Sequence, residues 1–374
     1  MAPSVLHVSR SVGGGVGRVV GDLVTDQVAR GWRVAVASPA GPLADEVAAV
    51  GAEHLEWAAR REVWSFVTEV AALSRLVRRY QPDVVHLHSA KAGLAGRLAV
   101  RGSTPTIYQP HGWPFTLGAR TDAGARAWER FAARWTDVVV CVSGSEATRG
   151  RAIGISGRIE VVHNGIDLAR FPATEDGQRI AARSALDMSV APLVVCVGRV
   201  CRQKGHDVLL DAWPLVRAAV PHATLAIVGD GPLRAELEAR TVEGVRWMGQ
   251  RDDVVRWLLA ADVVAQPSRW EGMAVTVLEA MASRRSLVVT DADGMVEAVG
   301  RGVEAAGAVV AIEDHMQLAD ALVDRLTDPA KAEHEGDMGR QRVEARFDRR
   351  RVDADVARLT TSLTSDGQRP KARS

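Results

Sequence analysis

The chain has 374 residues, of which 47% are hydrophobic and 25% are charged, and its formal net charge is +1. These values are typical of a folded protein of two domains and argue against a disordered or fibrous chain. A nearly neutral charge also disfavours general nucleic-acid binding, because proteins that track phosphates usually carry a clear basic excess.

Short valine-rich runs alternate with longer segments of helical period, which is the pattern of parallel strands joined by crossover helices. In the first half the expected strands are Val5–Ser9, Arg33–Ser38, Asp83–His88 and Val138–Ser143. A second series begins at Leu193 and continues with Ala223–Val228, Val245–Met248, Asp262–Gln266, Leu287–Thr290 and Ala308–Ile312. We therefore predict an α/β protein of two Rossmann-like, doubly wound domains.

The boundary between the two series is expected near residue 170. A turn-forming segment, Asn164-Gly165-Ile166-Asp167, precedes Phe171-Pro172 and a polar stretch. Ligands of such folds bind outside the carboxyl ends of the strands, and two such sheets can face each other across a cleft. The loops that follow the strands are therefore the first places to look for chemistry.

A glycine-rich turn, Gly13-Gly14-Gly15-Val16-Gly17, follows the first strand. Glycines let backbone amides approach a phosphate at the start of a helix, where the helix dipole favours anions. The turn does not fit the dinucleotide fingerprint, because Val20 stands where the third glycine should be when Gly15 and Gly17 are taken as the first two. A ligand loop and a plain tight turn are equal alternatives for this segment.

The first strand of the second half leads into a basic loop that holds Arg199 and Lys204. Lysine is rare in this chain, since positions 91, 204, 331 and 371 are its only lysines. An arginine fork and a lysine point charge on one loop can grip two phosphate groups. We favour this interpretation over a solvated surface pair.

The most informative segment contains two glutamates, Glu271 on a loop and Glu279 in the second turn of the helix expected to begin near Met273. At about 1.5 Å per residue the two carboxylates are about 10 Å apart along the axis, comparable with the span of a diphosphate between a sugar and a ribose. Each carboxylate could accept hydrogen bonds from hydroxyl groups. The amides expected to point at the phosphates are those of Met273, Ala274 and Val275.

Histidines also lie at the ends of apolar segments of the first half: His86 and His88 belong to the end of the expected strand Asp83–His88, and His111 follows a short apolar segment around Ile107 and Tyr108. No carboxylate at a suitable spacing completes a metal site with them, so we predict no metal and no cofactor. His111, just before a glycine, is better explained as a hydrogen-bond partner at the cleft mouth. Asp291-Ala292-Asp293 resembles a metal-binding Asp-x-Asp, and a turn with a helix cap explains it equally well.

The segment Arg60–Tyr80 places valines and a leucine on one helical face with arginines around it. Core packing of a crossover helix is the favoured explanation, and peripheral contact with a membrane surface is the alternative. We expect no signal peptide before the first strand, and no apolar run of the sequence approaches the roughly 20 residues of a membrane span. We expect a cytoplasmic protein, with the inner face of the membrane as a second option.

The cysteines, Cys141, Cys196 and Cys201, show no paired spacing and are expected to be buried hydrophobes.

With these loops in view, the chain resembles the retaining family 4 glycosyltransferases, which have the GT-B fold. The resemblance runs from the first strand to about residue 350. It rests on seven motifs in the right order: Gly14-Gly15, His86-Leu87-His88-Ser89 with Lys91-Ala92-Gly93, His111-Gly112, Val162-His163-Asn164-Gly165-Ile166-Asp167, Gly198-Arg199 with Lys204-Gly205, Val228-Gly229-Asp230-Gly231-Pro232, and the Glu-x7-Glu pair Glu271 and Glu279.

The resemblance implies a nucleotide diphosphate sugar donor, with UDP the commonest nucleotide, and a hydroxyl group as acceptor. The composition, typical of a GC-rich bacterium, leaves a cell-envelope glycan or lipid and a natural product as the alternatives for that acceptor. It implies an acceptor-side domain at residues 1–170, a donor domain at residues 171–346, and a last helix in residues 347–374 that crosses back to the first domain. Arg199 and Lys204 would hold the diphosphate without a metal, Glu271 would contact the transferred sugar, and Glu279 the ribose.

From the first domain, the resemblance brings Gly15 to the phosphates and His111 beside the sugar at the reaction centre. Two segments depart from the family pattern. Arg284-Arg285-Ser286-Leu287 stands where Gly-x-Pro is common, and Asp293-Gly294-Met295-Val296-Glu297 stands where a paired glycine and Pro-Glu are common. The second departure puts the identity of the sugar in doubt.

Two other classes of protein are compatible with the same loops. One is a sugar-nucleotide epimerase of similar architecture, and the other is a non-catalytic subunit that binds sugar nucleotides. An oxidoreductase is disfavoured because the dinucleotide fingerprint fails. The lysine-poor composition, rich in alanine and arginine, indicates a bacterium with a GC-rich genome.

Overall fold

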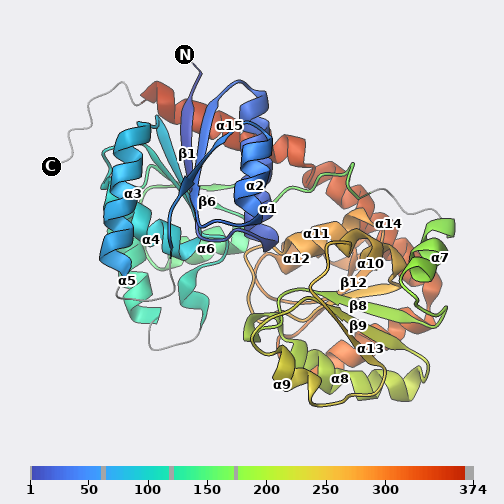
Figure 1. Ribbon diagram of the computed structural model, residues 1–374. Helices are drawn as coiled ribbons and strands as arrows, with labels where there is room; N and C mark the ends of the chain where they lie inside the picture. Colours follow the sequence, from blue (N-terminus) through green and yellow to red (C-terminus); the bar gives the residue numbers. More distant parts are fainter. Residues whose placement is uncertain (1, 60–64, 118–121, 172–175, 367–374) are drawn as a thin grey trace. The chain divides into compact units, whose positions relative to one another are not determined.

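The computed structural model describes residues 2–59, 65–117, 122–171 and 176–366, and the chain divides into two compact units (Figure 1). The first unit is Met1–Asn164 together with Arg349–Ser374, and the second is Gly165–Asp348. The boundary expected near residue 170 lies a few residues after this division. Arg60 and Arg61 of the predicted amphipathic segment lie outside the described residues.

The first unit is built on a seven-stranded sheet with the order β3-β2-β1-β4-β5-β6-β7, in which every pairing is parallel. Its strands are β1 (Ser4–Ser9), β2 (Arg33–Ser38), β3 (Glu53–Glu56), β4 (Val84–His88), β5 (Thr106–Gln109), β6 (Val138–Cys141) and β7 (Arg158–Val161). The doubly wound fold is confirmed. The sequence did not predict β5 or the edge strands β3 and β7. Strand β5 is buried but only four residues long, whereas β3 and β7 are only partly buried and carry no apolar run.

The helices of the first unit cover both faces of this sheet. They are α1 (Gly14–Ala29), α2 (Pro42–Ala49), α3 (Phe66–Tyr80), α4 (Ser89–Val100), α5 (Asp122–Ala132), α6 (Gly144–Ala152) and α15 (Arg349–Asp366). The last helix, α15, buries Val356, Leu359 and Leu363 in one core with residues of the sheet. An ion pair of 2.8 Å from Arg349 to Asp22 also fastens α15 to α1. The carboxyl-terminal helix therefore belongs to the first unit.

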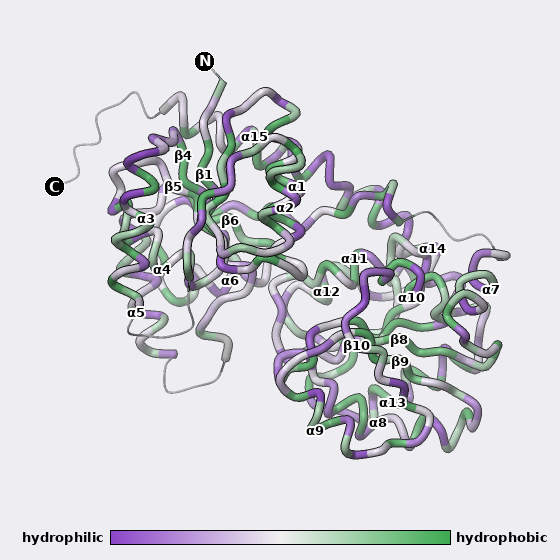
Figure 2. The backbone as a smooth tube through the Cα atoms, in the orientation of Figure 1, coloured by the Kyte–Doolittle hydropathy of each residue, from purple (hydrophilic) through white to green (hydrophobic). Residues whose placement is uncertain are grey.

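The second unit is built on a six-stranded sheet with the order β10-β9-β8-β11-β12-β13, again parallel. Its strands are β8 (Leu193–Val197), β9 (Thr224–Val228), β10 (Val245–Gly249), β11 (Val263–Gln266), β12 (Ser286–Thr290) and β13 (Gly307–Val310). All six strands predicted for the second half are present. Figure 2 shows hydrophobic residues concentrated along the strands of both sheets, as expected for parallel strands covered on both faces.

The helices of the second unit are α7 (Asp176–Ala185), α8 (His206–Ala219), α9 (Arg234–Glu238), α10 (Val254–Ala260), α11 (Val275–Ala282), α12 (Met295–Val299), α13 (His315–Thr327) and α14 (Pro329–Arg346). Helices α8 and α13 pack together over one face, where Trp213 and Leu322 are fully buried. No helix in the described ranges combines the length and apolarity needed to cross a bilayer.

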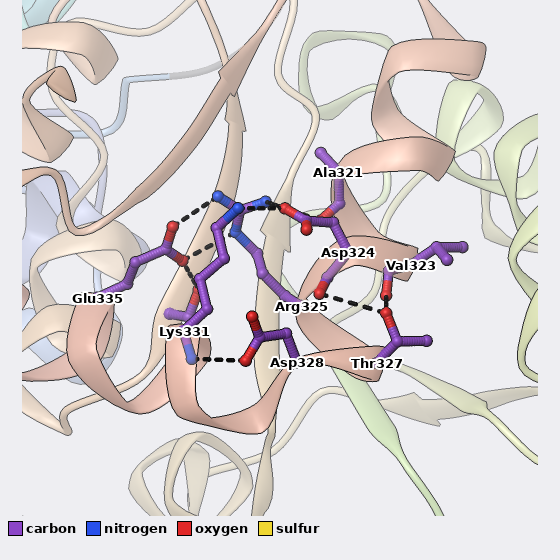
Figure 3. A network of polar contacts seen from close by, with 9 residues as sticks. Ala321, Val323, Asp324, Arg325, Thr327, Asp328, Lys331 and Glu335 are labelled. Carbon is purple, nitrogen blue, oxygen red and sulfur yellow. Dashed lines mark hydrogen bonds and ion pairs between the residues drawn. The ribbon is translucent and has the colours of Figure 1, made fainter. Parts of the chain in front are cut away.

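A polar network joins α13 to α14 (Figure 3). The Arg325 guanidinium donates to both carboxylate oxygens of Glu335, at 2.6 and 2.8 Å, and both side chains are nearly buried. Asp328 caps α14 by accepting a hydrogen bond of 3.0 Å from the amide of Lys331. This bidentate ion pair holds the two helices in one arrangement. Moving them apart would leave a buried charge without its partner, which is costly.

Candidate functional site

The glycine-rich turn opens directly into α1, which begins at Gly14. Gly14 has φ +66°, a left-handed conformation that strains any residue with a side chain. A Cβ atom added to Gly13 or Gly14 would meet nothing within 4 Å, and Gly15 is also exposed. Packing therefore does not explain these glycines, and the turn leaves the amides at the start of α1 open.

Four histidines lie in one row at the carboxyl end of the first sheet. His7 in β1 is the register partner of His86 in β4, two residues before His88, and His111 follows β5. His7 Nδ1 lies 3.0 Å from His88 Nε2, and His88 Nδ1 lies 3.1 Å from His111 Nε2. The strands alone bring these rings together, because β1, β4 and β5 are neighbours in the sheet.

Burial keeps these histidines uncharged. It lowers the pKa of His7 to about 4 and that of His111 to about 3, and it holds the pKa values of His86 and His88 well below their usual range. The apolar surroundings penalise the charged form, and for the two middle rings the neighbouring histidines lower the pKa further. The row is therefore neutral at physiological pH.

A buried carboxylate positions the loop that carries His111. Glu146 in α6 accepts hydrogen bonds from the amides of Gly112 at 2.5 Å and Val142 at 2.7 Å. His111 itself has φ +56°, which is uncommon for a residue with a side chain and costs about 1 kcal/mol. Such strain persists where the surroundings hold the backbone, and here Glu146 does so.

His7, His86 and His88 also form a group of side chains that could hold a metal ion, since their ligand atoms lie within 4.8 Å of one another. Sequence reasoning named His86 and His88 but missed His7, and it expected no metal. The signal for His7 was its place in β1, where an alternating pattern points it to the same face as His86. The metal-free expectation stays a prediction.

In the second unit, the predicted basic loop and the first glutamate lie side by side. Lys204 follows β8 and Glu271 follows β11, and these two strands are neighbours in the sheet. Lys204 Nζ lies 2.5 Å from Glu271 Oε1, and both side chains are largely buried. Arg199, on the same loop as Lys204, is exposed and has no ion pair in the described part of the chain.

Hydrogen bonds from neighbouring residues orient the Glu271 carboxylate. Ser268 Oγ donates to Glu271 Oε1 at 2.8 Å, and the Gln266 amide donates to Ser268 Oγ at 3.0 Å. The side chains of Gln266 and Ser268 are buried, so this row cannot exchange its partners for bulk water. Neither Ser268 nor Gln266 was predicted to contact Glu271, although both lie just ahead of it in the sequence.

Arg269 fastens the two loops of this site together. Its amide donates to the carbonyl oxygen of Gln203 at 2.7 Å, and its guanidinium pairs with Asp207 at 2.8 Å and Glu313 at 2.5 Å. The Gln203 side chain in turn donates to the carbonyl oxygen of Trp270 at 3.0 Å. These bonds fix the distance between the loop of Lys204 and the loop of Glu271.

The helix predicted to begin near Met273 begins at Val275, with Ala274 as its N-cap residue. The helix is α11, and Glu279 lies in its second turn as expected, where it is 2% exposed. A Cβ atom on Gly294 would lie 1.9 Å from the carbonyl oxygen of Gly272, so the loop after β12 closes tightly on the start of α11. The structure thus places the predicted residues of the second unit on adjoining loops at the carboxyl ends of the strands.

Comparisons with known proteins agree with this arrangement. Residues 13–170 match the model of the family "Glycosyltransferase Family 4", and residues 191–328 match that of "Glycosyl transferases group 1". A GDP-mannose-dependent monoacylated alpha-(1-6)-phosphatidylinositol monomannoside mannosyltransferase of Corynebacterium glutamicum is 29% identical over 75% of this chain and 76% of its own length. A UDP-Gal:alpha-D-GlcNAc-diphosphoundecaprenol alpha-1,3-galactosyltransferase of Escherichia coli is 29% identical over 60% of this chain and 61% of its own length.

Among solved structures, Anabaena Alr3699/HepE in complex with UDP-glucose has a TM-score of 0.83 at 21% identity, over 96% of this chain and 100% of that chain. Sucrose-phosphate synthase from Thermosynechococcus elongatus has a TM-score of 0.83 at 22% identity, over 97% and 99% of the two chains. These likenesses show the fold. Since the two family models together cover most of the sequence, the chain belongs to the family 4 glycosyltransferases and is a GT-B enzyme that uses a nucleotide-sugar donor.

Proposed function

We propose that the chain is a retaining, metal-independent hexosyltransferase that moves a sugar from a nucleotide diphosphate to a hydroxyl group of a cell-envelope glycan or lipid. The observation that carries the proposal is the contact of 2.5 Å between Lys204 Nζ and Glu271 Oε1, with Arg199 on the same loop as Lys204. A cation for phosphate and a carboxylate for hydroxyl groups are therefore adjacent.

The charges of the second unit match the charge that the reaction creates. When the bond between the anomeric carbon and the phosphate oxygen breaks, its electron pair goes to the diphosphate. Arg199 and Lys204 then stabilise the leaving diphosphate, and no divalent cation is needed for that task. The amides of Met273, Ala274 and Val275 are assigned to the same phosphates.

The two glutamates are assigned to hydroxyl groups, Glu271 to those of the transferred sugar and Glu279 to those of the ribose. Glu271 Oε1 already accepts hydrogen bonds from Lys204 and Ser268, which makes it a poor nucleophile. We therefore assign no protein nucleophile. The acceptor oxygen attacks the anomeric carbon from the face that the diphosphate leaves, and its proton passes to a phosphate oxygen.

The roles of the first unit rest on the family resemblance. Gly14 and Gly15 are assigned to the phosphates, and His111 to the neighbourhood of the sugar. The open turn at the start of α1 and the neutral row of histidines support these roles. Both remain predictions.

The names of the relatives support a proposal for the donor and the acceptor. Family frequency favours UDP, while the two relatives described above carry GDP-mannose and UDP-Gal in their names. Both names also specify a lipid-linked acceptor, and a third relative, 31% identical over 52% of this chain, is a lipopolysaccharide core mannosyltransferase of Rhizobium meliloti. We therefore favour an envelope acceptor over a natural product, and the inner face of the membrane as its place of action.

The test is a donor screen with the purified full chain, lipid extracts as acceptor, and UDP-, GDP- and deoxythymidine-linked sugars in parallel. Transfer should release the nucleotide diphosphate, retain the anomeric configuration in the product by NMR, and continue in excess EDTA. An inverted product or loss of activity in EDTA would refute the mechanism. Accumulation of an isomerised donor without acceptor would indicate an epimerase, and donor binding without turnover a non-catalytic subunit.

A further inference from the structure

We propose that a buried line of hydrogen bonds through Gln27, His7, His88 and His111 fixes which ring nitrogen of His111 carries hydrogen. His7 and His88 are then positioning residues that make His111 a neutral hydrogen-bond acceptor for a sugar hydroxyl group. The inference rests on the role proposed above for His111. Its geometry stands without that role.

The direction of the line follows from its inner end. Gln27 Oε1, an acceptor, lies 2.9 Å from His7 Nε2, so that nitrogen carries hydrogen and donates. A neutral imidazole has one donor and one acceptor, so His7 Nδ1 accepts from His88 Nε2 at 3.0 Å. His88 Nδ1 then accepts from His111 Nε2 at 3.1 Å, which leaves His111 Nδ1 with a free lone pair.

Burial makes this order rigid. Gln27 is 1% exposed, and His7 and His88 are not exposed at all, so no bulk water competes for their nitrogens. Only His111, at the outer end, is partly exposed. Reversal of the line would require every ring to change tautomer together, and a proton on any inner ring would place a charge in an apolar site. A substrate therefore meets an acceptor nitrogen on His111.

A metal ion explains the same histidines less well. His7 and His88 use both ring nitrogens in the line, and His86 Nε2 lies 3.1 Å from Gln109 Oε1. Of the ring nitrogens of His7, His86 and His88, only His86 Nδ1 has no hydrogen-bond partner among the described residues. The rings of His86 and His88 are stacked with centroids 4.1 Å apart, so their lone pairs lie side by side instead of converging on one point.

The direct test is the 15N–1H imidazole spectrum of the full chain with labelled histidine at neutral pH, in which His111 is assigned by the loss of its signals in His111→Asn. We expect His111 to be neutral with hydrogen on Nε2. Hydrogen on Nδ1, a mixture of tautomers, or a transition metal bound in a 1:1 ratio in the purified protein would overturn the inference. This readout does not depend on activity, so failure of His111→Asn to slow transfer would refute its proposed role and leave the line intact.

Two variants separate the line from simple packing. His7→Phe cuts the line, and we expect the His111 signals to shift to a mixture of tautomers and kcat to fall roughly tenfold, with little change in donor KM. His86→Phe is the matched control, since His86 is equally buried beside His7 but bonds to Gln109. Equal loss of kcat in both variants with an unchanged His111 spectrum would contradict the positioning role.

A second inference rests on a different observation, made at the amino-terminal ends of the strands of the second unit's sheet. A pocket of about 220 Å³ lies where the chain enters β8, β11 and β12, and five arginines line it: Arg179, Arg183, Arg284, Arg285 and Arg325. We propose that this pocket binds a small soluble phosphate compound between Arg179 and Arg285.

Arg285 carries the charge that the protein leaves uncompensated. Its guanidinium donates to the carbonyl oxygens of Ser283 and Ala261, at 3.0 and 3.2 Å, and has no ion pair within the described ranges. A guanidinium has five N–H donors, so others remain for a ligand. Burial lowers the pKa of Arg285 to about 10, and the charge of Arg179 is the next cause.

The other arginines are paired, some only weakly. Asp262 is shared between Arg183 at 2.5 Å and Arg179 at 3.3 Å, so one carboxylate serves two guanidinium groups. Arg325 is satisfied by Glu335 (Figure 3). Glu333 on the rim opposes an anion, but it is exposed and its charge is screened by water.

Arg284 supports a specific use of this edge. It pairs with Asp337, yet its φ of +54° is left-handed, where the related family commonly has glycine. A residue with a side chain at such a position strains the backbone, and the chain nevertheless has two arginines in succession here. The pair therefore suits a site that needs positive charge at the pocket wall.

The test is thermal unfolding with inorganic phosphate against chloride at equal ionic strength. Phosphate should raise Tm by a few degrees, and Arg285→Met should abolish the rise. Because a diphosphate site could also bind phosphate, Lys204→Met should keep the rise. Arg179→Met, on the exposed side, should weaken it if Arg285→Met does not fold. Arg240→Met, which removes a surface partner of Asp211, is the control.

The second inference fails if chloride raises Tm equally or if Arg285→Met and Arg179→Met keep the full rise. It also fails if Arg285 is required for binding to vesicles that contain phosphatidic acid while soluble phosphate has no effect, since the anion would then be a lipid headgroup. We expect no such requirement, because Arg285 is 7% exposed and lies too deep for a headgroup held in a bilayer.

Discussion

The carboxyl ends of the strands carry different kinds of polar group in the two sheets, neutral in one and charged in the other. In the first unit the edge is a row of neutral imidazoles joined by hydrogen bonds, from His7 to His111. In the second unit it is a set of charges, with Lys204 paired to Glu271 and the exposed Arg199 on the same loop as Lys204. Two sheets of the same topology thus offer hydrogen bonds at one edge and charge at the other.

Solvation explains where each kind of group lies. Neutral rings that form hydrogen bonds with one another cost little free energy to bury, and His7 and His88 have no exposed surface. A charged pair loses more solvation free energy when it is buried, and Lys204 and Glu271 keep 16% and 8% of their side-chain surface exposed. Neutral acceptors suit sugar hydroxyl groups, while exposed cations suit a diphosphate. The difference predicts that charge changes harm transfer most in the second unit.

The largest effect is expected from Lys204→Met. Lys204 is proposed to stabilise the leaving diphosphate, and removal of that cation should then lower kcat about 10²- to 10³-fold at saturating donor. Steady-state kinetics of nucleotide diphosphate release measure the loss. Lys331→Met is the matched control, because Lys331 pairs with Asp324 on an exposed face of α14. An unchanged rate in Lys204→Met would remove the charged edge from the mechanism.

Acid should weaken the first unit more than the second. His7, with its pKa lowered to about 4, binds protons in the unfolded chain before it does so in the folded one. Its stabilising contribution is therefore complete above about pH 6.5 and is lost as pH falls from 6.5 to 4. Burial also lowers the pKa values of His86 and His88, which act in the same direction, whereas His206, with its pKa lowered to about 4, is the comparable group of the second unit.

One carboxyl group of the first unit opposes this trend. Burial, followed by the charge of Asp26, raises the pKa of Asp353 to about 8, so its contribution is lost as pH rises from about 4 to 8. Asp353→Asn should therefore raise stability at pH 8 and leave the acid loss steeper. Chemical unfolding at pH 8, 6.5 and 4.5, followed by hydrogen exchange in each unit, measures both effects. Equal acid sensitivity of the two units would contradict the comparison.

Periodicity identified most of the fold and one edge of the site from the sequence. The valine-rich runs located all six strands of the second unit, and they placed Lys204 and Glu271 on loops that directly follow predicted strands, which the structure shows to be neighbours. Both results depend on local patterns, since a buried parallel strand is an apolar run and its loop follows at once. The edge strands β3 and β7 escaped because their residues are half exposed.

The hydrogen-bond partners could not be predicted in the same way. Gln27 lies in α1 and Glu146 in α6, and each meets its partner only after helices and strands far apart in the sequence have packed. Glutamine and glutamate are common on helices, so neither residue stands out against its neighbours. The position of His111 was predicted, but its left-handed backbone and the line behind it required the structure.

A smaller effect is expected from Glu146→Gln. The amide keeps one acceptor oxygen, so either Gly112 or Val142 loses its partner. Leaving one buried amide unsatisfied should cost about 1–3 kcal/mol of stability, and a looser His111 loop should lower kcat a few-fold. Urea unfolding and kinetics of the same preparation test both parts. Loss of stability with full activity would show that the loop need not be rigid.

The smallest effect is expected from Ser268→Ala, and it sharpens the comparison most. The hydroxyl group of Ser268 donates to Glu271 Oε1, but Lys204 reaches the same oxygen, so the charge pair outlasts the loss of the hydroxyl group. We expect a cost of about 1 kcal/mol, seen as a rise in donor KM of up to roughly tenfold with kcat nearly unchanged. If Ser268→Ala instead lowered kcat as far as Lys204→Met, the orientation of Glu271 would limit the reaction, and not the stabilisation of charge on the diphosphate. The second unit would then act through hydrogen bonds, as the first unit does.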